Sequence, residues 1–145
     1  MPLLLLGPAD LDAPPGGILA PEVAAVPAGF PSPAQDHYRG PVDLNEHLVG
    51  DRTSTFILRV QGDSMIGAGI FDGDELIVDR SLEASPGDVV VAIVDGELTV
   101  KRLGVTSGGV VLLAENPRYP SIPLVGDQEL VIWGCVTANI HRHRP

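Results

Sequence analysis

Residues 88–103 read DVVVAIVDGELTVKRL and carry the clearest local signal in the sequence. Two runs rich in β-branched residues lie on either side of Asp95 and Gly96. Such runs favour strands, and both members of an Asp-Gly pair tolerate the positive φ angles that a two-residue hairpin turn requires. The stretch therefore predicts a β-hairpin with its turn at Asp95-Gly96.

Further strand patterns lie on both sides of this hairpin. They are TFILRV (Thr55–Val60), ELIVD (Glu75–Asp79), VVLLAEN (Val110–Asn116) and ELVIWGCVTANI (Glu129–Ile140). A short helical segment of one or two turns is expected within Val42–Gly50, starting near Asp43 or Asn45. Short strands separated by turn signals predict a mostly β fold, a single small antiparallel β domain without βαβ units.

The composition of the chain changes before the first of these strands. Residues 1–38 are rich in Pro, Gly and Ala and show no helical or strand period, so we expect an extended, mobile N-terminal arm. Residues 39–145 are expected to form the folded body. A chain of 145 residues is long enough for one domain with a genuine core and too short for two comfortable ones.

The charge and hydropathy of the chain exclude several functions. The net charge of −10 argues against direct binding to nucleic acid, which needs clustered Lys and Arg. No apolar stretch approaches the ~20 residues that span a bilayer. The N-terminus lacks the basic start of a signal peptide, because the first Lys or Arg is Arg39. We therefore predict a cytoplasmic protein without a membrane segment.

Cysteine and histidine usage predicts neither a disulfide nor a metal site. The single cysteine, Cys135, lies in the apolar run LVIWGCV and is expected to be a buried thiol. His141 and His143 form an H-x-H pair in the basic tail, but no third ligand is evident. We expect no metal and no cofactor.

One serine and one lysine stand out as candidates for chemistry. Ser64 lies in QGDSMIGAGI (61–70), a run of small residues where little can pack. Side chains alternate along a strand, so Lys101 and Arg102 cannot both face solvent if one face is covered. A buried lysine has a lowered pKa and can act as a general base toward a serine. In the alternative interpretation Ser64 caps a turn and Lys101 is an ordinary lysine at a strand edge.

Two blocks of the sequence, 61–79 and 86–103, resemble the signature blocks of the LexA/UmuD family of self-cleaving Ser–Lys peptidases. The family pattern falls on Ser64 as nucleophile and Lys101 as general base, 37 positions apart. AGFPSPA, starting at Ala28, is similar to the cleavage-site region of that family, so the resemblance implies a scissile bond between Ala28 and Gly29. It also implies a LexA/signal-peptidase-like β fold.

The resemblance implies further roles at the same site. The backbone N–H groups of Asp63 and Ser64 would form the oxyanion hole, and Met65 would line the floor of the substrate pocket. Small residues at the scissile bond suit a tight site, and Val26 is expected to fill a shallow apolar pocket. Pro27, directly before the scissile pair, departs from the family pattern and fixes φ at that position.

The family also implies a cellular role and partners. Cleavage would be slow until a RecA–single-stranded DNA filament stimulates it after DNA damage. The shortened product would act as the homodimeric accessory subunit of an error-prone translesion polymerase. Fewer than 40 residues, without a helical pattern, precede the body, which favours the short UmuD-like form. The alternatives are a dimeric binding module that does not cut, a leader peptidase, and a repressor-type peptidase domain without its DNA-binding half.

Overall fold

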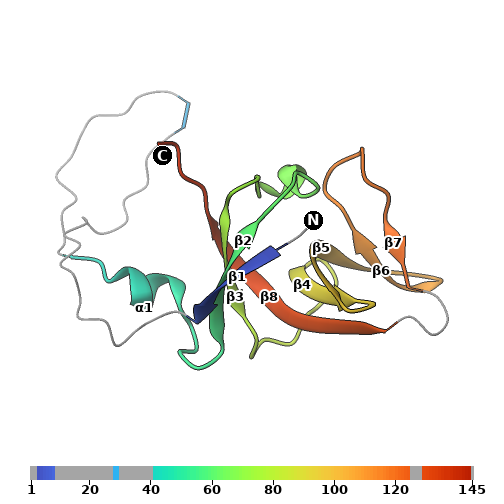
Figure 1. Ribbon diagram of the computed structural model, residues 1–145, viewed down its shortest axis with the longest axis horizontal. Helices are drawn as coiled ribbons and strands as arrows, with labels where there is room; N and C mark the ends of the chain where they lie inside the picture. Colours follow the sequence, from blue (N-terminus) through green and yellow to red (C-terminus); the bar gives the residue numbers. More distant parts are fainter. Residues whose placement is uncertain (1–2, 9–27, 30–40, 125–128, 145) are drawn as a thin grey trace.

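The computed structural model describes residues 3–8, 28–29, 41–124 and 129–144, and for 3–8 it describes the backbone alone (Figure 1). The elements are β1 (Leu3–Pro8), α1 (Leu44–Leu48), β2 (Thr55–Val60), η1 (Ile66–Ala68), β3 (Glu75–Asp79), β4 (Val89–Val94), β5 (Glu97–Thr106), β6 (Gly109–Leu113), β7 (Ile122–Pro123) and β8 (Leu130–Ile140). Within the described residues the strands form one sheet in the order β1-β2-β3-β8-β4-β5-β6-β7. Each neighbouring pair is antiparallel, which confirms the predicted fold class.

The long strand β8 joins the two halves of the sheet. Its second half pairs with β3 and its first half with β4, so that Cys135 lies opposite both Asp79 and Val90. Each pairing contains one shift of register. In Figure 1, α1 lies at one end of the molecule and β6 and β7 at the other, with β8 running between them. A single strand therefore connects the sheet across its length.

The β4–β5 hairpin has the turn that the sequence predicted. Val94 pairs with Glu97, and the two residues between them have positive φ angles, 48° at Asp95 and 84° at Gly96. Positive φ at both central residues is the geometry of the type I′ turn, whose twist matches that of paired strands. The register that follows from this turn places Lys101 opposite Val90.

Buried side chains form two hydrophobic clusters on the sheet. The first contains Leu58, Val60, Met65, Ile70, Leu76, Val78, Val91 and Val100, and the second contains Val90, Ala92, Leu103, Leu112 and Cys135. Because side chains alternate along β5, Val100 packs in the first cluster and Leu103 in the second. Lys101 lies on the same face of β5 as Leu103, whereas Met65, the neighbour of Ser64, packs in the first cluster. Lys101 therefore shares its face of β5 with a member of the second cluster, and Ser64 directly precedes a member of the first.

Outside the sheet, the predicted helical segment is confirmed as α1. Asp43 is its N-cap, because the Asp43 carboxylate accepts a hydrogen bond of 2.9 Å from the backbone N–H of Asn45. This satisfies one of the N–H groups that every helix start leaves without a partner.

The N-terminal segment differs in one respect from the predicted arm. Residues 3–8 form β1 and pair with β2, so the sheet holds this part of the chain. The run of leucines has no period that marks a strand, and the pairing depends on the open edge that β2 offers. Residues 9–27 and 30–40 lie outside the described residues, so the boundary at residue 38 stays a prediction.

Candidate active site

The structure brings Lys101 and Ser64 into direct contact. Lys101 is 5 % exposed, and its Nζ donates to Ser64 Oγ at 3.2 Å. Nζ also donates to Thr99 Oγ1 at 3.2 Å and to the backbone carbonyl of Val100 at 3.1 Å. Thr99 belongs to the contact because residues two apart on a strand share a face. The amine is thus held from one side by its own strand and directed at the serine.

The surroundings of Lys101 favour its neutral form. Burial lowers the pKa of the Lys101 ammonium, because a charged amine is costly in a medium of low dielectric constant. Among the described residues, Nζ donates only to two hydroxyls and a carbonyl, and none of these carries the negative charge that would restore an ordinary pKa. Such a lysine can accept a proton from a neighbouring hydroxyl.

The neighbouring cation, Arg102, has a different environment. It lies on the opposite face of β5 and is half-buried, and its guanidinium donates to the Glu115 carboxylate and to the carbonyl of Gly87. The prediction that one of the two adjacent cations would be buried is confirmed, and Lys101 is that residue. Arg102 thus has a carboxylate partner, whereas Lys101 has none in the part of the chain that the structure describes.

Ser64 is 1 % exposed and lies in the loop between β2 and β3. Its carbonyl accepts from the backbone N–H of Glu115 at 2.9 Å, and the N–H of Gly67 donates to the carbonyl of Glu115 at 2.7 Å. A Cβ at position 67 would lie 2.7 Å from that same carbonyl oxygen, so only glycine allows this approach. The turn after β6 therefore holds the serine loop by its backbone.

Asp63 is held by the same turn. Its carbonyl accepts from Asn116 Nδ2 at 2.9 Å, and its carboxylate accepts from the Tyr119 hydroxyl at 2.5 Å. The hydrogen bond to Asp63 raises the pKa of Tyr119, and the charge of Asp63 adds to the effect. Neither the N–H of Asp63 nor that of Ser64 forms a hydrogen bond within the described residues. Both groups could donate to an oxyanion, and that role stays a prediction.

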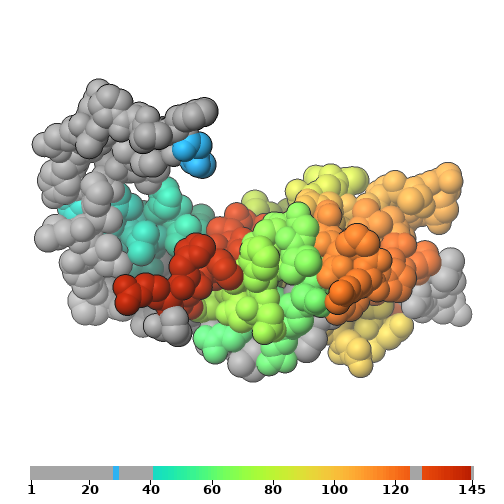
Figure 2. All heavy atoms as spheres, turned by 90° about the horizontal axis from the view of Figure 1, so that it is seen from above, coloured from blue at the N-terminus to red at the C-terminus, as the bar shows by residue number. Residues whose placement is uncertain are grey.

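The other predicted site residues do not join this group. Met65 is fully buried in the first cluster, in the manner of a core side chain, so its role in a substrate pocket stays a prediction. Val26 lies outside the described residues. Ala28 and Gly29 are exposed, and an added Cβ at Gly29 would meet nothing within 4 Å. Figures 1 and 2 show this pale-blue segment toward the α1 end of the molecule, away from the β4–β5 hairpin.

Sequence reasoning missed part of this site. Thr99 could have been found, because it lies two residues before Lys101 on a predicted strand and therefore on the same face. The segment Glu115–Tyr119, with the sequence ENPRY, gave no such signal, and its first two residues were wrongly predicted to end the strand Val110–Asn116, since β6 ends at Leu113. Its contacts with the serine loop join residues about 50 positions apart in the chain.

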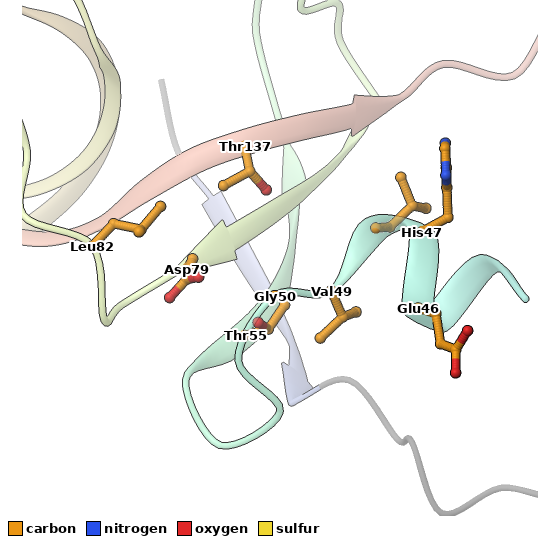
Figure 3. Close-up of a pocket in the computed structure, with 9 residues that line it drawn as sticks. Glu46, His47, Val49, Gly50, Thr55, Asp79, Leu82 and Thr137 are labelled. Atoms are coloured by element: carbon orange, nitrogen blue, oxygen red, sulfur yellow. The ribbon is translucent and has the colours of Figure 1, made fainter.

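A separate pocket lies between α1 and the end of the sheet (Figure 3). It has a volume of about 320 Å³ and is lined by Glu46, His47, Leu48, Val49, Gly50, Thr55, Asp79, Leu82 and Thr137. Asp79 is buried here, and hydrogen bonds from Ser81, with a further one from Ser54, lower the pKa of its carboxyl. The pocket contains neither Ser64 nor Lys101, so it is distinct from their site.

The described residues contain no group of three potential metal ligands, and none of their helices is long and apolar enough to cross a membrane. Cys135 is a buried free thiol, as predicted, and burial raises its pKa. Its sulfur donates to the carbonyl of Leu82 at 3.7 Å. The chemistry available in this region therefore lies with Ser64 and Lys101.

The sequence of this chain is similar to those of several known proteins. The family model described as Peptidase S24-like matches residues 21–137. Protein SamA of Salmonella typhimurium (strain LT2) is 44 % identical over 118 residues, which cover 81 % of either chain, and Protein MucA of Escherichia coli is 44 % identical over 119 residues with the same coverage.

A longer relative shares the same region. The LexA repressor of Acidothermus cellulolyticus is 40 % identical over 136 residues, which cover 94 % of this chain and 48 % of the repressor. The family match spans the serine loop, the β4–β5 hairpin and the turn after β6. These similarities confirm the resemblance to LexA and UmuD, and the chain belongs to the peptidase S24-like family.

Proposed function

We propose that this protein is a self-cleaving serine peptidase that cuts its own chain between Ala28 and Gly29. The observation that carries the proposal is a buried lysine amine with a lowered pKa, 3.2 Å from a serine hydroxyl. A serine needs a base to become a nucleophile, and Lys101 is the base that the geometry offers. Membership of the peptidase S24-like family supports the same reaction class.

The cut proceeds in two stages. Neutral Lys101 takes the proton of the Ser64 hydroxyl while Oγ attacks the carbonyl carbon of Ala28. The resulting oxyanion is bound by free backbone N–H groups, each worth about 3–4 kcal/mol in comparable sites. As the peptide bond breaks, Lys101 delivers its proton to the departing amine of Gly29, which leaves Ala28 as an ester on Ser64. A water molecule then hydrolyses the ester, with Lys101 again taking a proton and returning one to Ser64.

The position of Ala28 and Gly29 gives the reaction a natural control. In the structure these residues are exposed, and Figures 1 and 2 show them away from the hairpin that carries Lys101. Cleavage requires the segment to reach Ser64, so the observed rate scales with the fraction of molecules in which it does. A partner that favours the seated arrangement accelerates the cut without adding a catalytic group.

The similarity to SamA, MucA and the LexA repressor supports a role in the response to DNA damage. We propose that a RecA–single-stranded DNA filament is the stimulating partner in the cytoplasm. The shortened product then forms a homodimer and serves as accessory subunit of an error-prone translesion polymerase. The net charge of −10 fits a protein that reaches DNA through partners and does not bind it directly.

The test uses the purified full chain in two conditions, incubation with RecA filaments and incubation at a pH of about 10, where a lysine loses its proton. Mass spectrometry should detect a fragment that begins at Gly29. Ser64→Ala and Lys101→Ala should abolish the fragment, whereas Ser85→Ala, at an exposed serine, should leave it unchanged. Normal cleavage by both site variants, or no cleavage by the unaltered chain, would contradict the proposal.

A further inference from the structure

The turn that follows β6 does more than cover the serine loop. Its sequence is ENPRY, Glu115–Tyr119, and the backbone of its first residue is hydrogen-bonded on both sides to the loop. Glu115 donates to the carbonyl of Ser64, and Gly67 donates to the carbonyl of Glu115. Figure 2 shows this orange segment packed against the green loop. The turn is therefore placed to decide how the backbone around Ser64 is oriented.

Asn116 makes the most specific of these contacts. Asn116 is 6 % exposed, and its Nδ2 donates to the carbonyl of Asp63 at 2.9 Å. The other end of the same amide, Oδ1, accepts from the backbone N–H of Arg118 at 3.0 Å. Because Oδ1 is engaged by a donor, the orientation of the amide is determined and Nδ2 is the atom that faces Asp63.

The contact orients a neighbouring donor. The carbonyl of Asp63 and the N–H of Ser64 belong to one planar trans peptide, in which the two groups point in opposite directions. Holding the carbonyl toward Asn116 therefore directs the Ser64 N–H away from Asn116. Within the described residues that N–H forms no hydrogen bond, so it is available to an acceptor beside the serine hydroxyl.

We propose that Asn116 is a positioning residue that sets the direction of the Ser64 N–H and so preorganises the oxyanion hole. Asn116 itself touches neither substrate nor the reacting atoms. Without the Asn116 amide the Asp63–Ser64 peptide can rotate, and the Ser64 N–H no longer points at the negative charge that develops on the substrate oxygen. The identity of the acceptor as an oxyanion rests on the self-cleavage proposed above. The orientation of the Asp63–Ser64 peptide does not depend on that proposal.

A second asparagine offers a matched control. Asn139, on β8, also donates through Nδ2 to a carbonyl of the same loop, that of Gly69 at 3.0 Å, and to the buried Asp74 carboxylate at 2.9 Å. It holds the loop as Asn116 does, but its contact lies five residues beyond Ser64. Loss of either amide weakens the attachment of the loop, and only loss of the Asn116 amide frees the peptide that carries the Ser64 N–H.

The experiment compares the pH profiles of self-cleavage for the unaltered chain, Asn116→Ala and Asn139→Ala. Asn116→Ala should lower the limiting rate about tenfold or more, part of the loss expected for a whole oxyanion donor. The pH midpoint should stay unchanged, because Lys101 is untouched. Asn139→Ala should stay within about twofold of the unaltered chain. Asn116→Asp, close to isosteric but with an acceptor in place of the donor, repeats the test if the alanine variant folds poorly.

An NMR measurement separates this inference from the self-cleavage proposal. The measurement is an amide spectrum in which the signal of the Ser64 N–H has been assigned. Asn116→Ala should shift that signal, and Asn139→Ala should leave it in place. Absence of any cleavage by the unaltered chain would contradict the proposed function, while this spectrum would still decide the orientation of the peptide. An unmoved Ser64 signal in Asn116→Ala, or equal rate losses in the two variants, overturns the role of Asn116.

Discussion

The two partners of the candidate site are positioned by different physical means. Lys101 lies in the middle of β5, where its direction follows from the register of a hairpin with a defined turn. Ser64 lies in an irregular loop, whose backbone is held by a turn about 50 residues away in the chain. The hairpin directs Lys101 through local sequence, whereas the loop that carries Ser64 depends on distant contacts. The serine is therefore the partner whose position is easier to disturb.

Disturbing the loop should give the largest effect. Gly67→Ala places a Cβ 2.7 Å from the Glu115 carbonyl oxygen, so the hydrogen bonds that hold Ser64 must shift. Because a displacement of about 1 Å can cost about 100-fold in rate, we expect a loss of that order in self-cleavage. The measurement is the first-order rate of fragment formation at alkaline pH.

Gly108→Ala is the control for this change. Its Cβ would meet only the Thr106 hydroxyl, at an ordinary contact distance of 3.7 Å, in the β5–β6 turn. We expect a rate close to that of the unaltered chain. Equal rates for the two glycine variants would show that the approach of Gly67 to the turn has no part in placing Ser64.

For Lys101, the partner on strand β5, we expect a smaller effect, which concerns the stability of the fold. Lys101 has a pKa lowered below 10.5 in the folded chain, so between that lowered value and 10.5 the unfolded chain binds a proton that the folded chain does not. The free energy of unfolding therefore rises with pH through this window, by about 1.4 kcal/mol for each unit of lowering, and is reduced by the same amount below it. Lys101→Met should remove this pH dependence.

Urea unfolding measures the difference in stability between two variants, Ser64→Ala and the double variant Ser64→Ala with Lys101→Met. Neither variant is expected to cleave itself. The methionine variant should be the more stable of the two below the lowered pKa, and the gap should close as the pH approaches 10.5. A constant difference across this range would mean that Lys101 is charged in the folded protein.

Thr99→Val should give the smallest effect. The substitution keeps the shape of the side chain but removes a hydroxyl that accepts from the charged amine at 3.2 Å. Loss of a hydrogen bond to the charged form should lower the pKa of Lys101 further. The pH midpoint of self-cleavage should move down, with little change in the limiting rate. A midpoint that moves up would contradict the assigned direction of this hydrogen bond.

The difference between local and distant contacts also explains what could be predicted from the sequence. Strands β2 and β3 begin and end where their patterns predicted, and the turn at Asp95-Gly96 followed from local chemistry. The face alternation on β5 indicated one buried cation, but the resemblance to LexA and UmuD was needed to pair Lys101 with Ser64.

What escaped prediction depends on contacts between distant segments. The turn at Glu115–Tyr119 has no period of its own, and β1 becomes a strand through its pairing with β2. The register shifts of β8, which let one strand serve two neighbours, also leave no mark in the local sequence. Local patterns therefore predicted the strand that carries the base, and they did not predict the attachment of the loop that carries the serine.

The central claim is that Lys101 is neutral enough to act as a base, and the sequence permits a direct measurement. Lys101 is the only lysine among the 145 residues, so a chain labelled with isotope-enriched lysine gives one side-chain signal. NMR titration of that signal in Ser64→Ala reports the pKa of Nζ without interference from the cut. The midpoint should lie clearly below the ordinary value of 10.5. A midpoint at or above 10.5 would contradict the central claim.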